Sequence, residues 1–400
     1  MTSGYQPLKN RAHGIALCLS GGGFRAALFH LGSLRRLNES QLLPKVETIT
    51  SVSGGSIASA LLAKHWPTFN LANGVFTNFD AYETALRQFC TRDIRTGPLI
   101  WDRLDPKNWP MLVSDDHSAT DLLAQQYEDH LVPGLKLGDL VQPPPPGKPM
   151  PNFIFAASNL QTGVSFEQCA DHVGDYQIGY ANLPDMRVSD AVAASSAFPI
   201  AFPPLILKFE SVKFGGGKLG SSDLQRQLAR RIVLTDGGVY DNLGLEPVWK
   251  THSTVLCSDG GKPFGIVEDP GEIITSRLLR SQDVIGNQAL ALRKRWLVAS
   301  FENGVYGGSY WGIATEIEGY PHHGTGYGGK VLEQLRNVRT DLNPFTDGEQ
   351  LVLMNHGWAL TDAALRSYCT NLVSTNMGGG IAPSAALLND SAAALKAIGG

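Results

Sequence analysis

Two successive strand–turn–helix units open the chain, and they constrain its fold more than any other feature. An apolar run at residues 15–19 (IALCL) stops at residues 20–23 (SGGG), and apolar side chains then recur at helical spacing. A second apolar and β-branched run, residues 46–50, stops at residues 51–56 (SVSGGS) and is again followed by a helical pattern. Strands that alternate with helices in this way predict a parallel sheet with helices on its faces.

The composition indicates a globular protein that buries a large core without disulfides or metals. Of the 400 residues, 43% are apolar and only 18% are charged. The five cysteines are odd in number and form no CxxC pair, which argues against a disulfide framework or a structural zinc site and predicts reduced core thiols. A net charge of -4 leaves no strong basic field, so binding to nucleic-acid polymers is not expected. Any membrane contact should therefore be local and apolar.

The chain lacks the sequence features of a targeting or membrane-spanning segment. Its first residues contain no long apolar stretch of the signal-peptide type, and nowhere do about 20 consecutive apolar residues occur. We expect a cytoplasmic protein that contacts a membrane peripherally when active. Secretion by a route without a cleaved signal is also compatible with the sequence.

The second turn predicts a nucleophile. Residues 51–55 follow the G-x-S-x-G elbow pattern, in which a strand turns sharply into a helix and exposes the hydroxyl of the central serine. Here the central residue is Ser53, and Ser51 stands in place of the first glycine. The positions two before and two after the nucleophile must be small, a requirement that Ser51 and Gly55 meet.

The first turn can bind a developing negative charge. Gly21, Gly22 and Gly23 bring bare backbone N–H groups to the start of a helix, where the helix dipole favours an anion. The alternative is a dinucleotide-binding oxidoreductase, because Gly21, Gly23 and Ala26 also match the fingerprint G-x-G-x-x-G/A. That fingerprint expects an acidic residue at the end of the second strand, where this chain has Ser53 and its neighbours.

A serine nucleophile needs a base, and Asp236 is the better candidate. It ends a buried-type strand at residues 232–235, and Gly237 and Gly238 allow close approach to a neighbouring turn. Burial would raise the pKa of its carboxyl group toward neutrality. The alternative is a Ser53/Asp236/His356 triad esterase, but the triad fold places several strands before its elbow, and here only one precedes it.

These turns together resemble the patatin-like phospholipases. The resemblance is carried by residues 20–26 (SGGGFRA), 51–56 (SVSGGS) and 236–238 (DGG), with residues 159–166 and 194–205 between them. It covers about residues 14 to 250. It implies a three-layer α/β/α fold with a mostly parallel central sheet, a phospholipid or other acyl-ester lipid as substrate, and no metal or organic cofactor.

By this resemblance, Ser53 attacks the acyl carbonyl and Asp236 accepts its proton. The loop of Gly21, Gly22 and Gly23 would form the oxyanion hole, and Gly22 and Gly23 would donate their N–H groups. Supporting roles fall to Arg25, Gly55, Gly237 and Gly238. Ala26 and Ser51 depart from the glycines that are usual in the family, although both are small. Some bacterial members are effectors switched on by a cyclic nucleotide, so a small nucleotide activator is a further expectation, for which the sequence holds no specific feature.

The predicted domain organisation has one catalytic core and one extension. The core is expected at residues 10–262, with the proline-rich stretch 142–151 as a surface loop, because Ser53 and Asp236 lie on either side of it. Residues 263–400 should pack on the core, with a loosely ordered tail at 377–400.

Two further segments carry more open expectations. Residues 98–112, with Trp101 and Trp109, form either an interfacial lid or an ordinary loop packed on the core. A helix is expected at residues 276–301, and its basic cluster at 293–295 should face solvent.

Overall fold

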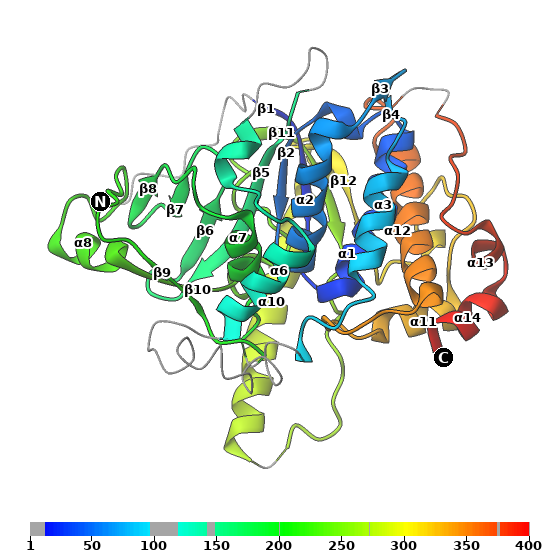
Figure 1. The fold of residues 1–400 in the computed structure, drawn as a ribbon. Helices are drawn as coiled ribbons and strands as arrows, with labels where there is room; N and C mark the ends of the chain where they lie inside the picture. Colours follow the sequence, from blue (N-terminus) through cyan, green and yellow to red (C-terminus); the bar gives the residue numbers. More distant parts are fainter. Residues whose placement is uncertain are drawn as a thin grey trace.

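A ten-stranded sheet forms the centre of the structure, a computed structural model that describes residues 13–96, 119–141, 149–199, 201–271, 273–373 and 377–399. The strands follow the order β12-β11-β1-β2-β5-β6-β7-β8, and β10 pairs with both β5 and β9 (Figure 1). The strands are β1 (His13–Leu19), β2 (Val46–Ser51), β5 (Asn152–Asn159), β6 (Val164–Gln168), β7 (Val173–Asp175), β8 (Gly179–Ala181), β9 (Leu205–Lys208), β10 (Arg231–Asp236), β11 (His252–Asp259) and β12 (Gly307–Gly312). A separate small ribbon pairs β3 (Leu71–Ala72) with β4 (Val75–Phe76).

The parallel part of the sheet is buried on both faces. Strands β12, β11, β1, β2 and β5 run parallel to one another. In β1, Leu17 and Leu19 enter the larger hydrophobic core, whereas Ala16 and Cys18 enter a smaller core on the opposite face. A strand that packs on both faces needs apolar residues at every position, which explains the continuous apolar run in this segment.

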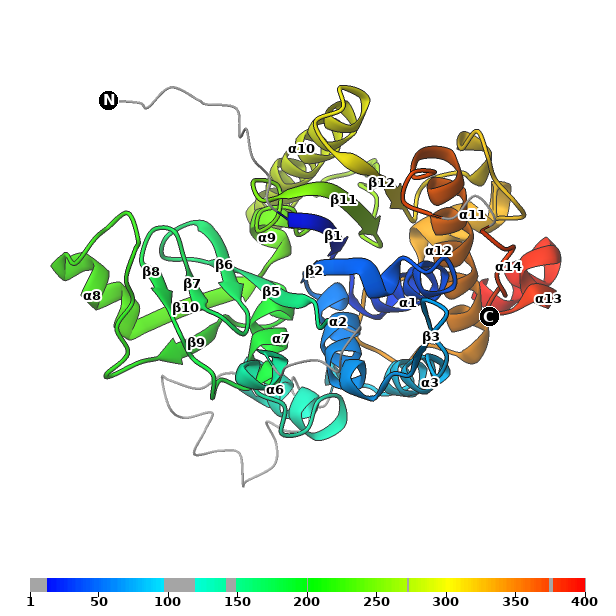
Figure 2. The same cartoon turned by 90° about the horizontal axis from the view of Figure 1, so that it is seen from above.

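Helices cover both faces of the sheet. The helices are α1 (Gly23–Glu39), α2 (Gly54–His65), α3 (Asp80–Phe89), α6 (Ala119–His130), α7 (Val188–Ser196), α8 (Asp223–Arg230), α9 (Gly238–Asp241), α10 (Ile274–Glu302), α11 (Gly329–Asn337), α12 (Asp347–Tyr368), α13 (Ala385–Asn389) and α14 (Ser391–Gly399). Figure 2 shows α1, α2, α3, α6 and α7 on one face and α9 and α10 on the other. The predicted three-layer α/β/α fold is confirmed.

An antiparallel extension continues the sheet beyond β5, which the repeated strand–turn–helix pattern did not predict. Strands β6, β7 and β8 follow β5 in antiparallel order, and β10 and β9 also pair antiparallel. Strand β5 therefore joins the parallel and antiparallel parts. The connections from β5 to β8 are short hairpins, and the pairing of β10 with β5 joins residues far apart in the chain, so the helical and strand periodicities near the N-terminus carry no signal for either.

The C-terminal part of the chain shares the sheet and packs on the core. Strand β12 pairs with β11, so the sheet continues across the boundary expected at residue 262, and the domain division remains a prediction. Residues 377–399 differ from the loose tail that we expected, because they contain α13 and α14, which contact α12. Leu388, Ala394 and Ile398 on these helices are buried.

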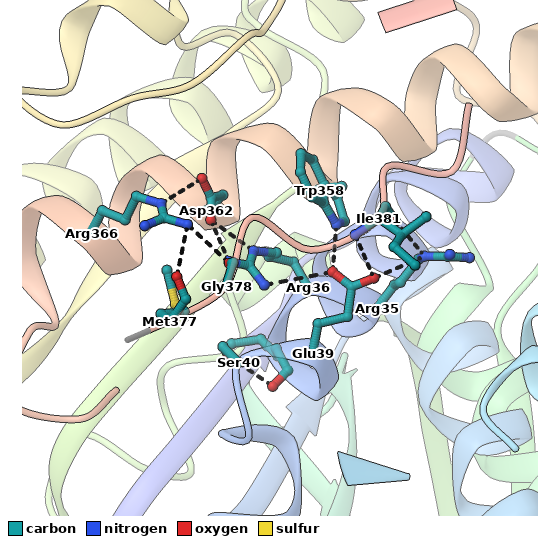
Figure 3. Close-up of polar contacts among 11 residues, drawn as sticks. Arg35, Arg36, Glu39, Ser40, Trp358, Asp362, Arg366, Met377, Gly378 and Ile381 are labelled. Carbon is teal, nitrogen blue, oxygen red and sulfur yellow. Dashed lines mark hydrogen bonds and ion pairs between the residues drawn. The ribbon is translucent and has the colours of Figure 1, made fainter. Parts of the chain in front are cut away.

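A buried polar network fastens the segment after residue 377 to α1 and α12 (Figure 3). The guanidinium of Arg36 is buried, donates to the Asp362 carboxylate at 2.7 Å and donates to the Gly378 carbonyl at 2.7 Å. Glu39 accepts a hydrogen bond of 2.9 Å from the indole N–H of Trp358. These bonds satisfy buried charges that would otherwise be costly to desolvate.

Several expected features fall outside the described residues. They include the segment with Trp101 and Trp109, and residues 142–148 of the proline-rich stretch. In the part of the chain that is described, no helix is long and apolar enough to cross a bilayer. All five cysteines are buried free thiols.

The contact between α1 and α12 predicts opposite effects for the same substitution at two glycines. A Cβ on Gly32 would lie 1.9 Å from the Met354 carbonyl oxygen, whereas a Cβ on Gly286 in α10 would meet nothing within 4 Å. Gly32→Ala should lower the free energy of unfolding by roughly 1–3 kcal/mol, because the two helix backbones must separate. Gly286→Ala should raise it by about 0.5–1 kcal/mol, because alanine is the better helix former. Thermal and urea denaturation measure both, and an unchanged melting temperature for Gly32→Ala would contradict the packing.

Candidate active site

Two strands meet end to end along one edge of β5. Strand β2 runs parallel to β5 with Ser51 opposite Phe155, and β10 runs antiparallel with Asp236 opposite Ala157. Both Phe155 and Ala157 also pair with β6, which occupies the other edge of β5. Since β2 and β10 therefore share one edge and point toward each other, the turns that follow them converge although they are far apart in sequence.

The turn after β2 is strained and tightly packed. Ser53 has φ 51° and ψ -117°, a backbone conformation that non-glycine residues rarely adopt, and the residue is 9% exposed. A Cβ on Gly54 would lie 2.0 Å from the Gly23 carbonyl oxygen, and one on Gly55 would lie 2.3 Å from the Leu19 carbonyl oxygen. Gly54 and Gly55 thus let this sharp turn pack directly against the strand and glycine turn of residues 19–23.

Ser195, near the end of α7, joins the two turns. Its carbonyl oxygen accepts hydrogen bonds of 3.2 Å from the N–H groups of both Ser53 and Gly237. Its hydroxyl accepts from Ser53 N–H at 3.0 Å and donates to the Ala156 carbonyl at 2.6 Å. Sequence reasoning noted this residue only as part of the segment 194–205 and assigned it no role, because nothing local marks a carbonyl that accepts from two distant turns.

Ser51, which stands in place of the usual elbow glycine, belongs to a buried chain of hydroxyl groups. Its Oγ lies 2.7 Å from Ser59 Oγ and accepts from Ser56 Oγ at 3.1 Å. Ser56 Oγ in turn lies 2.8 Å from Ser195 Oγ. The Ser51 hydroxyl therefore has hydrogen-bond partners, and these bonds connect the end of β2 and the first turns of α2 to the Ser195 junction.

Asp236 places a buried carboxylate beside Ser53. Its Oδ1 accepts a hydrogen bond of 2.7 Å from the Gly238 N–H group. Burial raises the pKa of Asp236 to about 6, although the Gly238 N–H group and a hydrogen bond with the Ser53 side chain act in the opposite direction. A carboxylate with a pKa near neutrality can accept a proton from a hydroxyl group more readily than an exposed one. Gly237 allows this approach, since a Cβ there would lie 2.3 Å from the Ala156 carbonyl oxygen.

The glycine turn after β1 presents two free backbone donors. Gly22 has φ 143° and Gly23 has φ 59°, which only glycine adopts without strain. Gly21 N–H donates to the Asn242 carbonyl at 3.1 Å, so this group is already engaged. Within the described residues, the N–H groups of Gly22 and Gly23 have no hydrogen-bond acceptor, and they lie at the N-terminus of α1.

Arg25 links two backbone segments that lie beside the glycine turn. Its buried guanidinium donates to the Gly260 carbonyl at 2.9 and 3.2 Å and to the Val338 carbonyl at 2.9 Å. Burial lowers the pKa of Arg25 to about 10. His30 donates from Nε2 to the Ser20 carbonyl at 2.9 Å, which fixes the start of the same turn. Burial lowers the pKa of His30 to about 4, so the ring is neutral. Arg25 is thus a strut between backbone segments.

The basic cluster of α10 faces inward, contrary to the expectation that it would face solvent. Lys294 Nζ lies 2.5 Å from the Asp259 carboxylate at the end of β11, and Arg293 lies 3.1 Å from Glu246 and 3.7 Å from Asp241. Burial would raise the pKa of Asp259, but Lys294 and a tyrosine hydroxyl hold it below its ordinary value. The buried carboxylates of Asp241 and Asp259 require cations, and α10 supplies them. Of the cluster, Arg295 is exposed.

His356 is not brought to the site. It is buried on α12, donates from Nε2 to the Ile313 carbonyl at 2.9 Å and packs against Phe29. Burial lowers the pKa of His356 to about 4. Its contacts include neither Ser53 nor Asp236, so the described residues do not assemble the alternative triad.

Close backbone packing explains the glycines of this turn. A Cβ on Gly22 would lie 2.8 Å from the Gly260 carbonyl oxygen, and one on Gly23 would lie 2.2 Å from the Thr340 carbonyl oxygen. The G-x-G pattern therefore has a structural cause that does not require a pyrophosphate. No cluster of three or more His, Cys, Asp or Glu side chains suited to a metal ion occurs among the described residues.

Comparison with known proteins agrees with this architecture. A family model described as "Patatin-like phospholipase" matches residues 17–249. No curated protein sequence matches the chain. The structure of human GIVD cytosolic phospholipase A2 with methyl gamma-linolenyl fluorophosphonate is similar in fold, with a TM-score of 0.50 and 14% identity over 97% of this chain and 60% of that one.

Two bacterial structures are more distant. VipD from Legionella pneumophila has a TM-score of 0.38 and 14% identity over 90% of this chain and 67% of that one. ExoU from Pseudomonas aeruginosa, in complex with SpcU, has a TM-score of 0.28 and 17% identity over 71% of this chain and 52% of that one. The chain spans about half the length of the human phospholipase chains that it matches.

The raised pKa of Asp236 predicts a pH-dependent stability difference. Because its folded-state pKa of about 6 exceeds the ordinary value of 3.8, the buried carboxylate destabilises the fold above pH 6 and does so progressively less as it is protonated. Asp236→Asn should therefore melt at a higher temperature than the wild type at pH 8. The difference between the two melting temperatures should shrink as the pH falls through about 6 and disappear below about 4. The exposed Asp171→Asn serves as the control, and a lower melting temperature for Asp236→Asn at pH 8 would contradict the burial argument.

Proposed function

The chain belongs to the patatin-like phospholipase family, and we propose that it hydrolyses acyl esters of phospholipids through an acyl-enzyme on Ser53. The observation that carries the proposal is the convergence of Ser53 and the buried Asp236 on one edge of β5, held by a shared hydrogen-bond acceptor. A hydroxyl at a strained elbow and a carboxylate with a raised pKa supply a nucleophile and its base. The substrate class follows from the family and includes other acyl-ester lipids.

In the first half of the reaction, Asp236 takes the proton of the Ser53 hydroxyl as its oxygen attacks the acyl carbonyl. The carbonyl oxygen becomes an oxyanion, and the free N–H groups of Gly22 and Gly23 are the donors we propose for it. Removal of one such donor typically raises the barrier by about 2.7–4 kcal/mol. The positive end of the α1 dipole acts in the same direction. Because these donors belong to a rigid turn, they need no rearrangement when the charge develops.

The first half is completed when the ester bond breaks and the protonated Asp236 returns its proton to the departing alcohol oxygen, and the second half is the hydrolysis of the acyl-enzyme. A water molecule then attacks the acyl-enzyme, with Asp236 again as the base, and Ser53 regains its proton as the fatty acid leaves. Each proton taken by Asp236 is thus returned within the same half-reaction. Apart from the substrate and the attacking water, the proposed steps use side chains and backbone groups of this chain.

Control by a small nucleotide is a separate expectation that rests on the family alone. None of the described contacts assigns a residue to such an activator, so it remains a prediction from the resemblance. A peripheral contact with the lipid surface is part of the proposal, because the substrate is held in a lipid aggregate.

The dyad predicts which substitutions abolish turnover. Ser53→Ala and Asp236→Asn should each lower kcat/KM for phospholipid vesicles at least about a thousandfold, because each removes one partner of a unit that acts together. His356→Asn should keep activity within about tenfold once corrected for folded protein, since the buried ring touches neither group. Fatty-acid release measures all three. Loss of turnover in all three variants would favour the Ser53/Asp236/His356 triad, full activity in Asp236→Asn would contradict the dyad, and an active Ser53→Ala would exclude the proposal altogether.

The pH dependence should report Asp236 rather than a histidine. Since the base must be ionised, kcat/KM should be low at acidic pH, rise through an inflection near 6 and then level off. Fatty-acid release from a neutral ester substrate between about pH 4.5 and 9 tests this, because the substrate itself does not titrate there. An inflection that shifts in His356→Asn would show that the assignment to Asp236 is wrong.

A further inference from the structure

Helix α10 projects from the sheet edge that carries Ser53 and Asp236. Lys294 pairs with Asp259 at the carboxyl end of β11, so this point of the helix is level with the end of the strand. Residues 274–292 therefore extend beyond the sheet, over roughly 27 Å at 1.5 Å per residue. Figure 1 shows α10 and the loop before it standing out below the body of the protein.

The projecting part is apolar and uncovered. In the whole of α10, only Leu297 and Ser300 are buried. More than half of the large apolar side chains exposed among the described residues lie between residues 264 and 298. Ile266 is 97% exposed, Ile274 is 72% exposed and Leu278 is 63% exposed. Helices are ordinarily stabilised by packing of an apolar face, and exposed apolar patches of this kind mark contact surfaces.

The loop and the helix form one fixed unit, which we name the α10 tip (residues 264–271 and 273–285). Arg277 donates to the Gly271 carbonyl at 3.2 Å, and Arg280 donates to the Gly265 carbonyl at 2.8 Å. The Arg280 guanidinium also lies over the Phe264 ring, 4.1 Å from its centroid. The apolar side chains are therefore held in place at the end of the projection.

The distribution of apolar side chains favours a lipid surface over a second helix. Leu278 and Leu279 are adjacent, about 100° apart around the helix, and both are exposed, so apolar groups face more than one side of the tip. A single partner helix would cover one stripe, whereas acyl chains surround an inserted tip.

The charges of the α10 tip leave the apolar side chains as its means of contact. Its two arginines, Arg277 and Arg280, stand against the three carboxylates of Glu268, Asp269 and Asp283. Both guanidinium groups already donate to backbone carbonyls of the loop. The tip therefore has no excess of positive charge, and its contact with a phospholipid surface should be carried by apolar insertion.

We propose that the α10 tip inserts into the head-group region of a phospholipid surface and holds the Ser53 edge of the sheet against it. The role of this contact in catalysis rests on the proposed function, since a lipid hydrolase must draw its substrate from such a surface. The base of the helix is coupled to the site, because Arg293 also contacts the Tyr240 carbonyl at 3.5 Å in α9, which follows Asp236.

The test measures vesicle binding without turnover. In a Ser53→Ala background, the double variant Ile274→Glu/Leu278→Glu should bind vesicles of phosphatidylcholine and phosphatidylserine at least about tenfold more weakly in co-sedimentation, because two apolar anchors become charged. Ile381→Glu is the matched control. Ile381 is also 72% exposed, but its backbone bonds Arg35 and Glu39 at the far end of α1, away from the Ser53 edge. Equal binding by the double variant and the control would overturn the proposal.

A second measurement separates this inference from the proposed function. With Ser53 intact, the double variant should hydrolyse a monomeric short-chain ester within about twofold of the wild type and lose turnover on vesicles about tenfold. If the wild type cleaves no ester, the proposed function is wrong. The vesicle-binding experiment would still test whether the α10 tip docks on a phospholipid surface. A double variant that changes from dimer to monomer in sedimentation, with vesicle binding unchanged, would assign the tip to a second copy of the chain and overturn the proposal.

Discussion

One carbonyl oxygen, that of Ser195, holds the candidate site together. It accepts from the N–H groups of Ser53 and Gly237, and so it sets the distance between a turn after β2 and a turn after β10. The two strands already point at each other along one edge of β5. The elbow at Ser53 has a strained backbone, and such strain persists only where surrounding bonds over-determine it. The Ser195 junction and the packing of Gly54 against Gly23 provide that constraint.

Burial raises the pKa of carboxyl groups at this edge of the sheet, and the neighbouring polar groups decide the direction of the net shift. Asp236 is removed from water and meets few donors, so the pKa of its carboxyl rises. Asp259 is equally buried, yet Lys294 stands directly against it, and its pKa falls. Two aspartates at strand ends on the same sheet edge therefore differ in kind: one can exchange a proton near neutral pH and the other remains an ionised anchor. We infer that the first serves catalysis and the second holds α10.

The C-terminal part of the chain contributes more than a cover for the core. It supplies β12 to the sheet, α12 against α1, and the cations that neutralise Asp241 and Asp259. Through those ion pairs α10 is anchored beside the site, while its first turns remain unpacked. A helix that is rigid at its base and apolar at its exposed end is suited to contact an apolar phase.

The sequence by itself determined the elements and chemical groups that local patterns encode. Apolar periodicity and glycine turns were sufficient for the first two strand–helix units, for β10 and α10, and for Ser53, Asp236 and the glycine turn as candidate residues. Only the tertiary structure decided the antiparallel extension, the Ser195 junction, the inward face of Arg293 and Lys294, and the role of Arg25 as a strut. The physical reason is that strand pairing and buried ion pairs join residues far apart in the chain, whereas propensity and periodicity report only neighbours within a few turns.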